Sequence, residues 1–272
     1  MLRPRILGEG KASPAGRARG TPSVLFYRPF LRKVVRGMAK LTIFLDYDET
    51  LNDSHGLLAK SFQGFLGMDG ADIKREFDDV HEWIVTGEHT NHHEDIEFHL
   101  EHMVRRLGHD NQKSRDEAMR RFKEGVDNTI HARAIFDDAL PFLRALEKMD
   151  VTVCLATGDY AKEKAESIEK ALGKRIFAKY FDAGITGFYK RDGGFYPRAM
   201  EIAGVKPAAS LSIGDSPERD IAPAKAAGMS TIWLARNGQS YPKALAAPDN
   251  SVRTLTEAAV LISGGFGSRV RQ

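Results

Sequence analysis

The sequence predicts an α/β protein, with a Rossmann-like, doubly wound parallel sheet and an α-helical insertion after the first strand. Three observations favour this class. Short apolar runs recur along the chain, helical patterns alternate with the later runs, and about a hundred residues with only helical periodicity separate the first run from the second. Alternation of buried strands with helices is typical of a parallel sheet whose faces are covered by helices.

Four apolar runs are predicted to be strands of this sheet. The first, residues 41–45, reads Leu-Thr-Ile-Phe-Leu, and a nearly continuous apolar run is typical of a strand that is buried on both faces. Residues 151–156, 211–213 and 231–235 have the same texture. Residues 181–187 also resemble a strand.

Helical patterns surround the second and third runs. Helices are predicted over residues 139–149 and 160–172 on either side of the second run, and over residues 197–203 and 217–227 on either side of the third. These helices are expected to cover the sheet.

The insertion has three sets of apolar positions, each spaced for one face of a helix. A small helical bundle is therefore expected, with residues 61–66 as its opening helix. The three sets are Ile73, Phe77, Val80 and Trp83 or Ile84; Ile96, Leu100, Met103 or Val104 and Leu107; and Met119, Phe122, Val126 and Ile130.

The chain is expected to divide into three parts: a basic leader over residues 1–38, an α/β core over residues 39–54 and 133–272, and a helical domain over residues 55–132. The first forty residues contain ten Lys or Arg and one acidic residue, so the rest is mildly acidic although the net charge is +3. Pro and Gly are frequent in the leader, which predicts disorder. We interpret it as an over-extended start, with translation beginning at Met38; an organelle transit peptide and a nucleic-acid-binding arm are the alternatives.

Composition excludes several other classes. With 42% hydrophobic and 28% charged residues, the chain is too apolar for a disordered protein. It has no run of the roughly 18 apolar residues that a membrane span needs, and the leader lacks the apolar core of a secretory signal, so a cytoplasmic protein is expected. The single cysteine, Cys154, excludes an internal disulfide and a zinc site built from several thiolates.

Polar residues that could carry chemistry follow the first three of these strands. Asp46 and Asp48 follow the first strand, Thr157 and Gly158 the second, and Asp215 the third. The carboxyl ends of parallel strands meet at one crevice, where ligands bind. Clustered carboxylates repel one another unless a cation such as Mg²⁺ neutralises them.

This set of groups suits magnesium-dependent phosphoryl transfer. A carboxylate can attack phosphorus and form an aspartyl-phosphate, and a second one can protonate the leaving group and later activate water. The hydroxyl of Thr157 and the backbone N–H of Gly158 are suited to hold phosphate oxygens. A lysine is then needed to offset the remaining negative charge.

In these residues the chain resembles the haloacid dehalogenase (HAD) superfamily of phosphohydrolases, from about residue 41 to residue 261. Residues 46–50 match its first motif, D-x-D-x-T, and Thr157 matches the second. Residues 214–220 match the fourth motif, G-D-x-x-x-x-D, and Lys190, 25 residues before Asp215, matches the third. The usual Pro after that lysine is Arg191 here, so Lys179 is the alternative.

The resemblance implies a role for each residue. Asp46 is the expected nucleophile and a Mg²⁺ ligand, and Asp48 is the expected general acid/base, which also offers its backbone carbonyl to the metal. Thr157 and Lys190 bind the phosphoryl group together with Gly158. Asp215 completes the protein ligands of Mg²⁺, and Asp220 supports the metal or Lys190 from behind.

The resemblance also implies a reaction and a substrate class. Members that cleave carbon–halogen or carbon–phosphorus bonds typically lack the second acid, which is Asp48 here. The position of the insertion resembles the subfamily with a helical cap, whose members mostly act on small phosphorylated metabolites. A phosphomonoesterase, monomeric or homodimeric, is therefore expected, with a phosphomutase or phosphotransferase as the alternative and a nucleic-acid-binding protein as the more distant one.

Histidines crowd the expected cap, and seven of the nine lie between residues 81 and 109. Three interpretations stay open for them: a zinc site, a role in substrate binding, and solvated helix surface. The residues are His81, His89, His92, His93, His99, His102 and His109.

Overall fold

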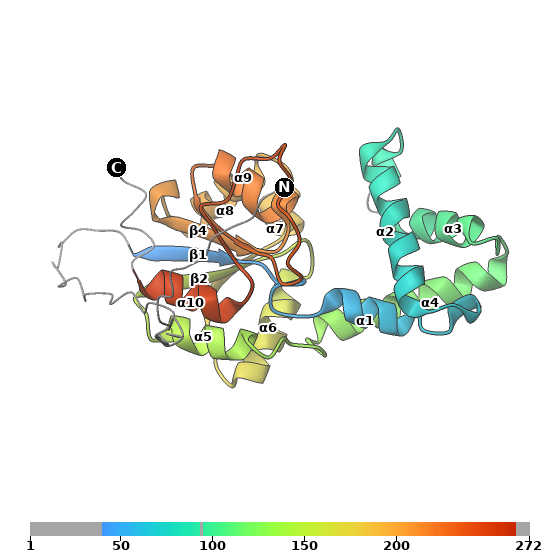
Figure 1. The fold of residues 1–272 in the computed structure, drawn as a ribbon, viewed down its shortest axis with the longest axis horizontal. Helices are drawn as coiled ribbons and strands as arrows, with labels where there is room; N and C mark the ends of the chain where they lie inside the picture. Colours follow the sequence, from blue (N-terminus) through green and yellow to red (C-terminus); the bar gives the residue numbers. More distant parts are fainter. Residues whose placement is uncertain (1–39, 93–94, 265–272) are drawn as a thin grey trace, which may run out of the picture. The chain divides into compact units, whose positions relative to one another are not determined.

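The computed structural model describes residues 40–92 and 95–264. They contain a parallel sheet of six strands in the order β3-β2-β1-β4-β5-β6 (Figure 1). This arrangement confirms the predicted fold class. The strands are β1 (Leu41–Leu45), β2 (Val151–Ala156), β3 (Phe177–Phe181), β4 (Ser210–Gly214), β5 (Ser230–Leu234) and β6 (Asn250–Val252).

The first strand lies at the centre of the sheet, between β2 and β4. From β1 the chain adds β2 and β3 on one side and later β4, β5 and β6 on the other. The strand order therefore reverses at β1, and ligands of open α/β sheets bind at such a reversal, beyond the carboxyl ends of the strands.

Alternate side chains of β1 enter two different apolar layers. Ile43 and Leu45 pack in a core with helices α5 (Ala139–Glu147), α6 (Ala161–Leu172) and α10 (Leu255–Ser263). Phe44 packs in a second core with α8 (Phe195–Ala203) and α9 (Ala222–Ala226). Figure 1 shows these two helices on the opposite side of the sheet from α5 and α10. Covering both faces explains why β1 is almost continuously apolar.

Helices α1 (Ser54–Ser61), α2 (Gly70–Thr86), α3 (Ile96–Arg106) and α4 (Gln112–Ile130) follow β1 and share a core of their own. Each begins at a side chain that caps its first turn: Asp53, Asp69, Asp95 and Asn111 accept hydrogen bonds from backbone N–H groups of α1, α2, α3 and α4 respectively. The members of this core include Phe62, Phe65, Ile73, Phe77, Val80, Ile84, Leu100, Met103, Val104 and Ala118.

The two chain segments that join these helices to the sheet lie side by side. Asn52 and Ile135 form an antiparallel bridge. The backbone N–H of Asp53 donates to the carbonyl of Ala134 (2.8 Å), and the side-chain carbonyl of Asn52 accepts from the N–H of Ala134 (3.1 Å). The chain is thus held together where it leaves the sheet for the helices and where it returns from them.

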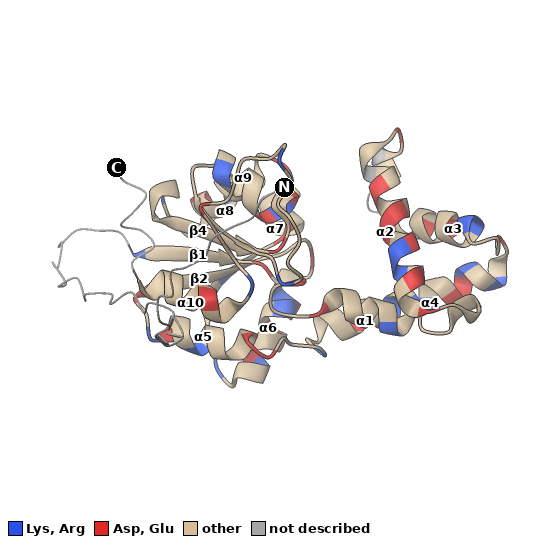
Figure 2. Cartoon of the chain, viewed as in Figure 1, with Lys and Arg blue, Asp and Glu red and all other residues tan. Residues whose placement is uncertain are grey.

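Charged residues of both signs are mixed along the helices after β1 (Figure 2). Lys74 pairs with Asp78 at 2.5 Å, and Arg106 pairs with Glu76 at 3.2 Å across α3 and α2. Within the described residues, no helix is both long enough and apolar enough to span a membrane. The basic leader predicted over residues 1–38 lies outside the described residues.

The structure corrects several predicted element positions. Residues 181–187 are not one strand: β3 ends at Phe181, and residues 183–186 form the short helix α7, capped by Asp182. The opening helix of the insertion ends at Ser61 rather than beginning there, and Gly64, with a left-handed φ of 77°, interrupts the chain just after it.

Other element boundaries also differ. The predicted helix over residues 217–227 is a π-helical turn over 217–221 followed by α9. Helix α8 begins two residues before its predicted start, at Phe195. Strand β6 and helix α10 were not predicted. The strand gives no apolar signal, because it has only three residues and Asn250 and Ser251 are not apolar.

Candidate active site

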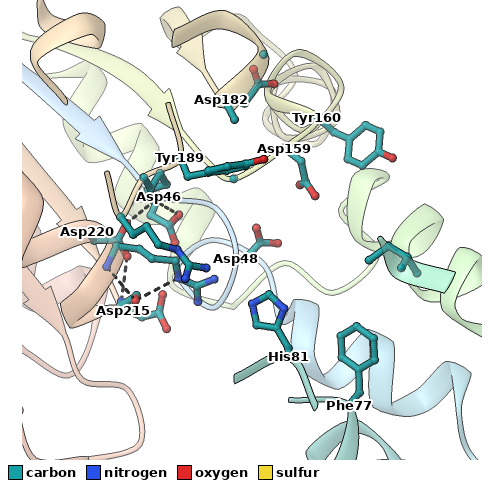
Figure 3. Close-up of a pocket in the computed structure, with 18 of the residues that line it drawn as sticks. Asp46, Asp48, Phe77, His81, Asp159, Tyr160, Asp182, Tyr189, Asp215 and Asp220 are labelled. Carbon is teal, nitrogen blue, oxygen red and sulfur yellow. Dashed lines mark hydrogen bonds and ion pairs between the residues drawn. The ribbon is translucent and has the colours of Figure 1, made fainter. Parts of the chain in front are cut away.

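Three neighbouring strands bring polar side chains to one place. Asp46, Thr157 and Asp215 directly follow β1, β2 and β4. Leu45 of β1 pairs with Leu155 of β2 and with Ile213 of β4, so the three strands end at the same level. Figure 3 shows Asp46, Asp215 and Asp220 gathered there, with Asp48 pointing into the same pocket.

Lys190 holds two of these carboxylates. Its ammonium donates to Asp46 Oδ1 at 2.6 Å and to the carbonyl of Ala156 at 2.9 Å, and it forms an ion pair with Asp220. All three charged side chains are at least nine-tenths buried. The neighbouring carboxylates raise the pKa of Lys190 despite its burial, so the lysine stays charged.

The structure places Lys190, and not Lys179, in the site. Lys179 lies on β3, where its residue is exposed. The loop between α7 and α8 carries Lys190 back to the ends of β1 and β2.

Asp46, Asp215 and Asp220 form an acidic cluster. One carboxylate oxygen from each lies within 4.8 Å of the others. Burial and the charge of Asp220 raise the pKa of Asp46 to about 6, although Lys190 opposes the rise. Burial and the charge of Asp46 raise the pKa of Asp215 to about 8. A bound cation would relieve this repulsion, and three carboxylate oxygens suit a hard ion such as Mg²⁺.

Asp48 lies in a different environment from Asp46. Its Oδ1 accepts from the hydroxyl of Ser54 at 2.6 Å, and its Oδ2 accepts from Lys164 at 2.9 Å and from Thr157 at 3.2 Å. Removal from bulk water raises the pKa of Asp48, but the charge of Lys164 and the bond from Ser54 outweigh it and lower the pKa to about 2. The two carboxylates of the D-x-D sequence therefore have opposite pKa shifts.

Thr157 is fully buried at the end of β2 and contacts Asp48, while Gly158 after it lines the pocket. Asp220 is buried behind Asp46, and its Oδ2 accepts from the backbone N–H of Ser216 at 2.9 Å. The structure thus gathers all seven residues that the sequence analysis singled out.

Sequence reasoning missed Lys164 and Ser54. Lys164 is 2% exposed, and its ammonium contacts Asp48, Asp159 and Thr157. A signal was available: Lys164 occupies the face of its helix that also carries Ala161, Ala165 and Ile168. A lysine on the apolar face of a helix, seven residues after the motif threonine, indicates a buried charge that needs a partner.

The pocket in front of these groups has a volume of about 630 Å³. Core residues including Tyr160, Tyr189 and Arg219 line it, together with Phe77, His81, Ile96 and Phe122 from the helices after β1. The helical insertion therefore contributes apolar and aromatic surface to the same pocket as the carboxylates.

The histidines of the insertion divide into two environments. His81 lines the pocket, and its Nδ1 lies 3.1 Å from Nε2 of the buried His99. His92 stacks on Phe98 instead, and the ring of His102 lies against Phe98 at a tilt of 37°. Among the described residues, no histidine belongs to a group of three ligands with metal-binding geometry; His93 lies outside them.

The chain was compared with protein families, curated proteins and solved structures, and two of these comparisons gave matches. A sequence model of haloacid dehalogenase-like hydrolases matches residues 41–228. Among curated proteins, none matches the chain. Solved structures do match: YfnB of Bacillus subtilis, described as a HAD-hydrolase and bound to magnesium, is 17% identical with a TM-score of 0.65, and the match covers 83% of this chain and 99% of that one.

Two further structures are similar at the level of the fold. The L-2-haloacid dehalogenase of Xanthobacter autotrophicus is 16% identical, with a TM-score of 0.64. The HAD phosphatase of Thermococcus onnurineus is 18% identical, with a TM-score of 0.54. Each match covers 83% of this chain and 99% of the other. Because neighbours of both kinds share the fold, the fold alone does not select between dehalogenation and phosphate hydrolysis.

The tight packing behind the acidic cluster predicts the effect of one methyl group. A Cβ on Gly214 would lie 2.3 Å from the carboxyl group of Asp220, whereas a Cβ on Gly193 meets no atom within 4 Å. We expect Gly214→Ala to lower the free energy of unfolding by about 1–3 kcal/mol, because Asp220 cannot move without disturbing its buried pair with Lys190. Urea denaturation measures the free energy of unfolding of the wild type and the variant. Gly193→Ala is the control; an equal effect of both changes would contradict the packing argument.

Proposed function

The chain belongs to the haloacid dehalogenase-like hydrolases, and from this premise we propose that it is a Mg²⁺-dependent phosphomonoesterase acting on a small phosphorylated metabolite. The observation that carries the proposal is the pair Asp46 and Asp48 beside the acidic cluster of Asp46, Asp215 and Asp220. A nucleophile, an acid/base and a cation site are the three parts that phosphate-ester hydrolysis through an aspartyl-phosphate requires.

In the first half-reaction a carboxylate oxygen of Asp46 attacks phosphorus, and the bond from phosphorus to the leaving oxygen breaks. Lys190 fixes the Asp46 carboxylate through its 2.6 Å contact, and its positive charge stabilises the added negative charge of the phosphoryl group. Asp48, in its protonated form, gives a proton to the leaving oxygen. The negative charge of the incoming ester favours that form of Asp48.

In the second half-reaction Asp48 takes a proton from water as the water oxygen attacks phosphorus. The bond between phosphorus and Asp46 breaks, which releases phosphate and restores the free carboxylate. The Thr157 hydroxyl and the Gly158 N–H are the proposed donors to the phosphoryl oxygens.

Asp46, Asp215 and the backbone carbonyl of Asp48 are the proposed holders of Mg²⁺, with Asp220 supporting them or Lys190. When bound, the ion supplies positive charge that offsets the phosphoryl oxygens and the carboxylates. The high pKa values of Asp46 and Asp215 fit such a site, because these groups lack sufficient positive charge without the ion.

Residues 55–132 are proposed to act as a cap over the core. Phe77, Ile96 and Phe122 from this segment line the pocket, so closure over a bound ester would replace water by apolar surface.

The structural neighbours that are dehalogenases suggest dehalogenation as the competing activity. A panel of phosphorylated metabolites assayed for phosphate release, with 2-chloropropionate assayed for chloride release, separates the two; chloride release alone would contradict the proposal.

The proposed nucleophile gives the first functional prediction. Asp46→Asn keeps the side-chain shape but cannot attack phosphorus, so we expect phosphate release to fall by at least about 10³-fold while the fold persists. Steady-state kinetics and circular dichroism measure the two properties. Asp79→Asn, an exposed change on α2, is the matched control. Near-normal turnover by Asp46→Asn would show that another group is the nucleophile.

The acidic cluster gives a prediction about metal. Turnover of a phosphate ester is expected to require Mg²⁺ and to disappear with EDTA, because the repulsion within the cluster is otherwise uncompensated. Added Mg²⁺ is also expected to raise the melting temperature of the wild type, and less so that of Asp215→Asn. Full activity in EDTA is the result that excludes the metal assignment.

The third functional prediction concerns Asp48. If Asp48 protonates the leaving oxygen, Asp48→Asn reduces turnover of alkyl phosphates more than that of aryl phosphates, whose leaving anion needs no proton. General acid catalysis contributes about 10²- to 10⁴-fold, so the two losses should differ by at least about tenfold. Phosphorylated Asp46 should accumulate with the aryl ester. Equal losses and no trapped intermediate would show that Asp48 is not the acid.

A further inference from the structure

Lys164 is a second buried lysine beside the reacting groups, and no motif accounts for it. It lies on α6, with its side chain 3% exposed, and its ammonium has three acceptors within hydrogen-bond distance. They are Asp159 Oδ1 at 2.7 Å, Asp48 Oδ2 at 2.9 Å and Thr157 Oγ1 at 3.1 Å. The ammonium also lies 5.1 Å from the centre of the Tyr47 ring.

These contacts use the full donor capacity of the lysine. An ammonium has three N–H bonds and no acceptor, so each bond is matched by one of the three oxygens. If the ammonium turned toward another partner, the partly buried carboxylate of Asp48 or the buried hydroxyl of Thr157 would lose a donor, which is costly. The Lys164 ammonium is therefore fixed relative to Asp48 and Thr157.

The contact with Thr157 sets the direction of the hydroxyl hydrogen. Because Thr157 Oγ1 accepts a hydrogen from Lys164, its own hydrogen has to point to another acceptor, which in this structure is Asp48 Oδ2 at 3.2 Å. The oxygens of a phosphate dianion only accept hydrogen bonds. A hydroxyl that is committed to donating is the form that such an oxygen requires.

The contact with Asp48 fixes the acid/base. Ser54 donates to Oδ1 of Asp48 at 2.6 Å, and Lys164 donates to Oδ2 at 2.9 Å, so both oxygens are held. Each carboxylate of the D-x-D sequence thus has its own buried lysine, Lys190 for Asp46 and Lys164 for Asp48.

We propose that Lys164 is a positioning residue that aims the Thr157 hydroxyl at the phosphoryl group and fixes Asp48 beside the leaving oxygen. The inference rests on the proposed phosphatase function. In a purely structural role, Lys164 would only anchor α6 to the sheet. The proposed positioning role differs, because it predicts energetic coupling between Lys164 and two reacting side chains, Thr157 and Asp48.

A double-mutant cycle tests the coupling. Turnover of p-nitrophenyl phosphate with Mg²⁺ is measured for the wild type, Lys164→Met, Thr157→Val and the double variant. A second cycle pairs Lys164→Met with Asp48→Asn and uses an alkyl phosphate, whose leaving oxygen needs the proton. Lys164→Met alone is expected to lower kcat/KM by roughly 10- to 100-fold, the loss typical of a charge-assisted hydrogen bond. In each double variant, adding Lys164→Met is expected to lower kcat/KM by less than about threefold beyond the loss that the other substitution causes alone.

A binding measurement provides a readout besides turnover. Calorimetric titration with inorganic phosphate is expected to show weaker binding by Lys164→Met and by Thr157→Val, with no further weakening in the double variant. Lys162→Met is the matched control, because Lys162 lies on the exposed side of the same helix and should leave both measurements unchanged. Should Lys164→Met fail to fold, Lys164→Gln takes its place in both cycles.

The outcomes separate the two proposals. Multiplicative losses in the cycles, or a Lys164→Met enzyme within about twofold of the wild type, would overturn the role of Lys164 and leave the phosphatase function intact. A wild-type protein that neither hydrolyses any phosphate ester nor binds phosphate would overturn both.

Discussion

Mutual repulsion of carboxylates at the carboxyl end of the sheet is the constraint on which the site depends. Asp46, Asp215 and Asp220 place oxygens within 4.8 Å of one another in a largely buried position. Desolvation and like charge both disfavour three ionised carboxylates there. The folded chain tolerates them because Lys190 pairs with two of them, and the remaining imbalance is what a divalent cation would correct.

The topology of the sheet explains how the compensating charges reach this point. Because β1 is central and the strand order reverses there, the connections after β2 and β3 both return to the edge of the crevice. The first connection begins with α6 and brings Lys164 to Asp48; the second brings Lys190 to Asp46. The two carboxylates are two residues apart in the sequence, but their cations come from separate crossovers.

Prediction from the sequence worked where the information is local. The strands β1, β2, β4 and β5 are apolar runs, and Asp46, Thr157 and Asp215 directly follow three of them, so their meeting point follows from parallel pairing alone. Lys164 could not be placed in this way, because it lies within α6 and not at the end of a strand, and only the folded crossover brings it to Asp48. Helix α1 was misplaced because a capping contact, from Gly56 to Asp53, decides its start and its apolar periodicity does not.

The turn after Asp48 leads into the helical insertion, and a contact from the core fixes its shape. Glu49 has a left-handed φ of 57°, which is strained for a residue with a side chain. Arg236 counteracts that strain: it donates to the carbonyls of Glu49 (3.1 Å) and Thr50 (2.7 Å) while it binds Asp138 through two hydrogen bonds.

Asp138 and Phe136, whose ring lies 4.0 Å from the Arg236 guanidinium, belong to the segment that returns from the insertion. One guanidinium thus ties the outgoing turn and the returning segment to the loop after β5. A planar guanidinium can make several such bonds at fixed angles, so Arg236 fixes the turn that joins Asp48 to α1. The proposed acid/base is therefore held at the junction of the two parts, by Lys164 from the core and by Ser54 at the start of α1, while Phe77 and Phe122 of the helical insertion line the pocket in front of it.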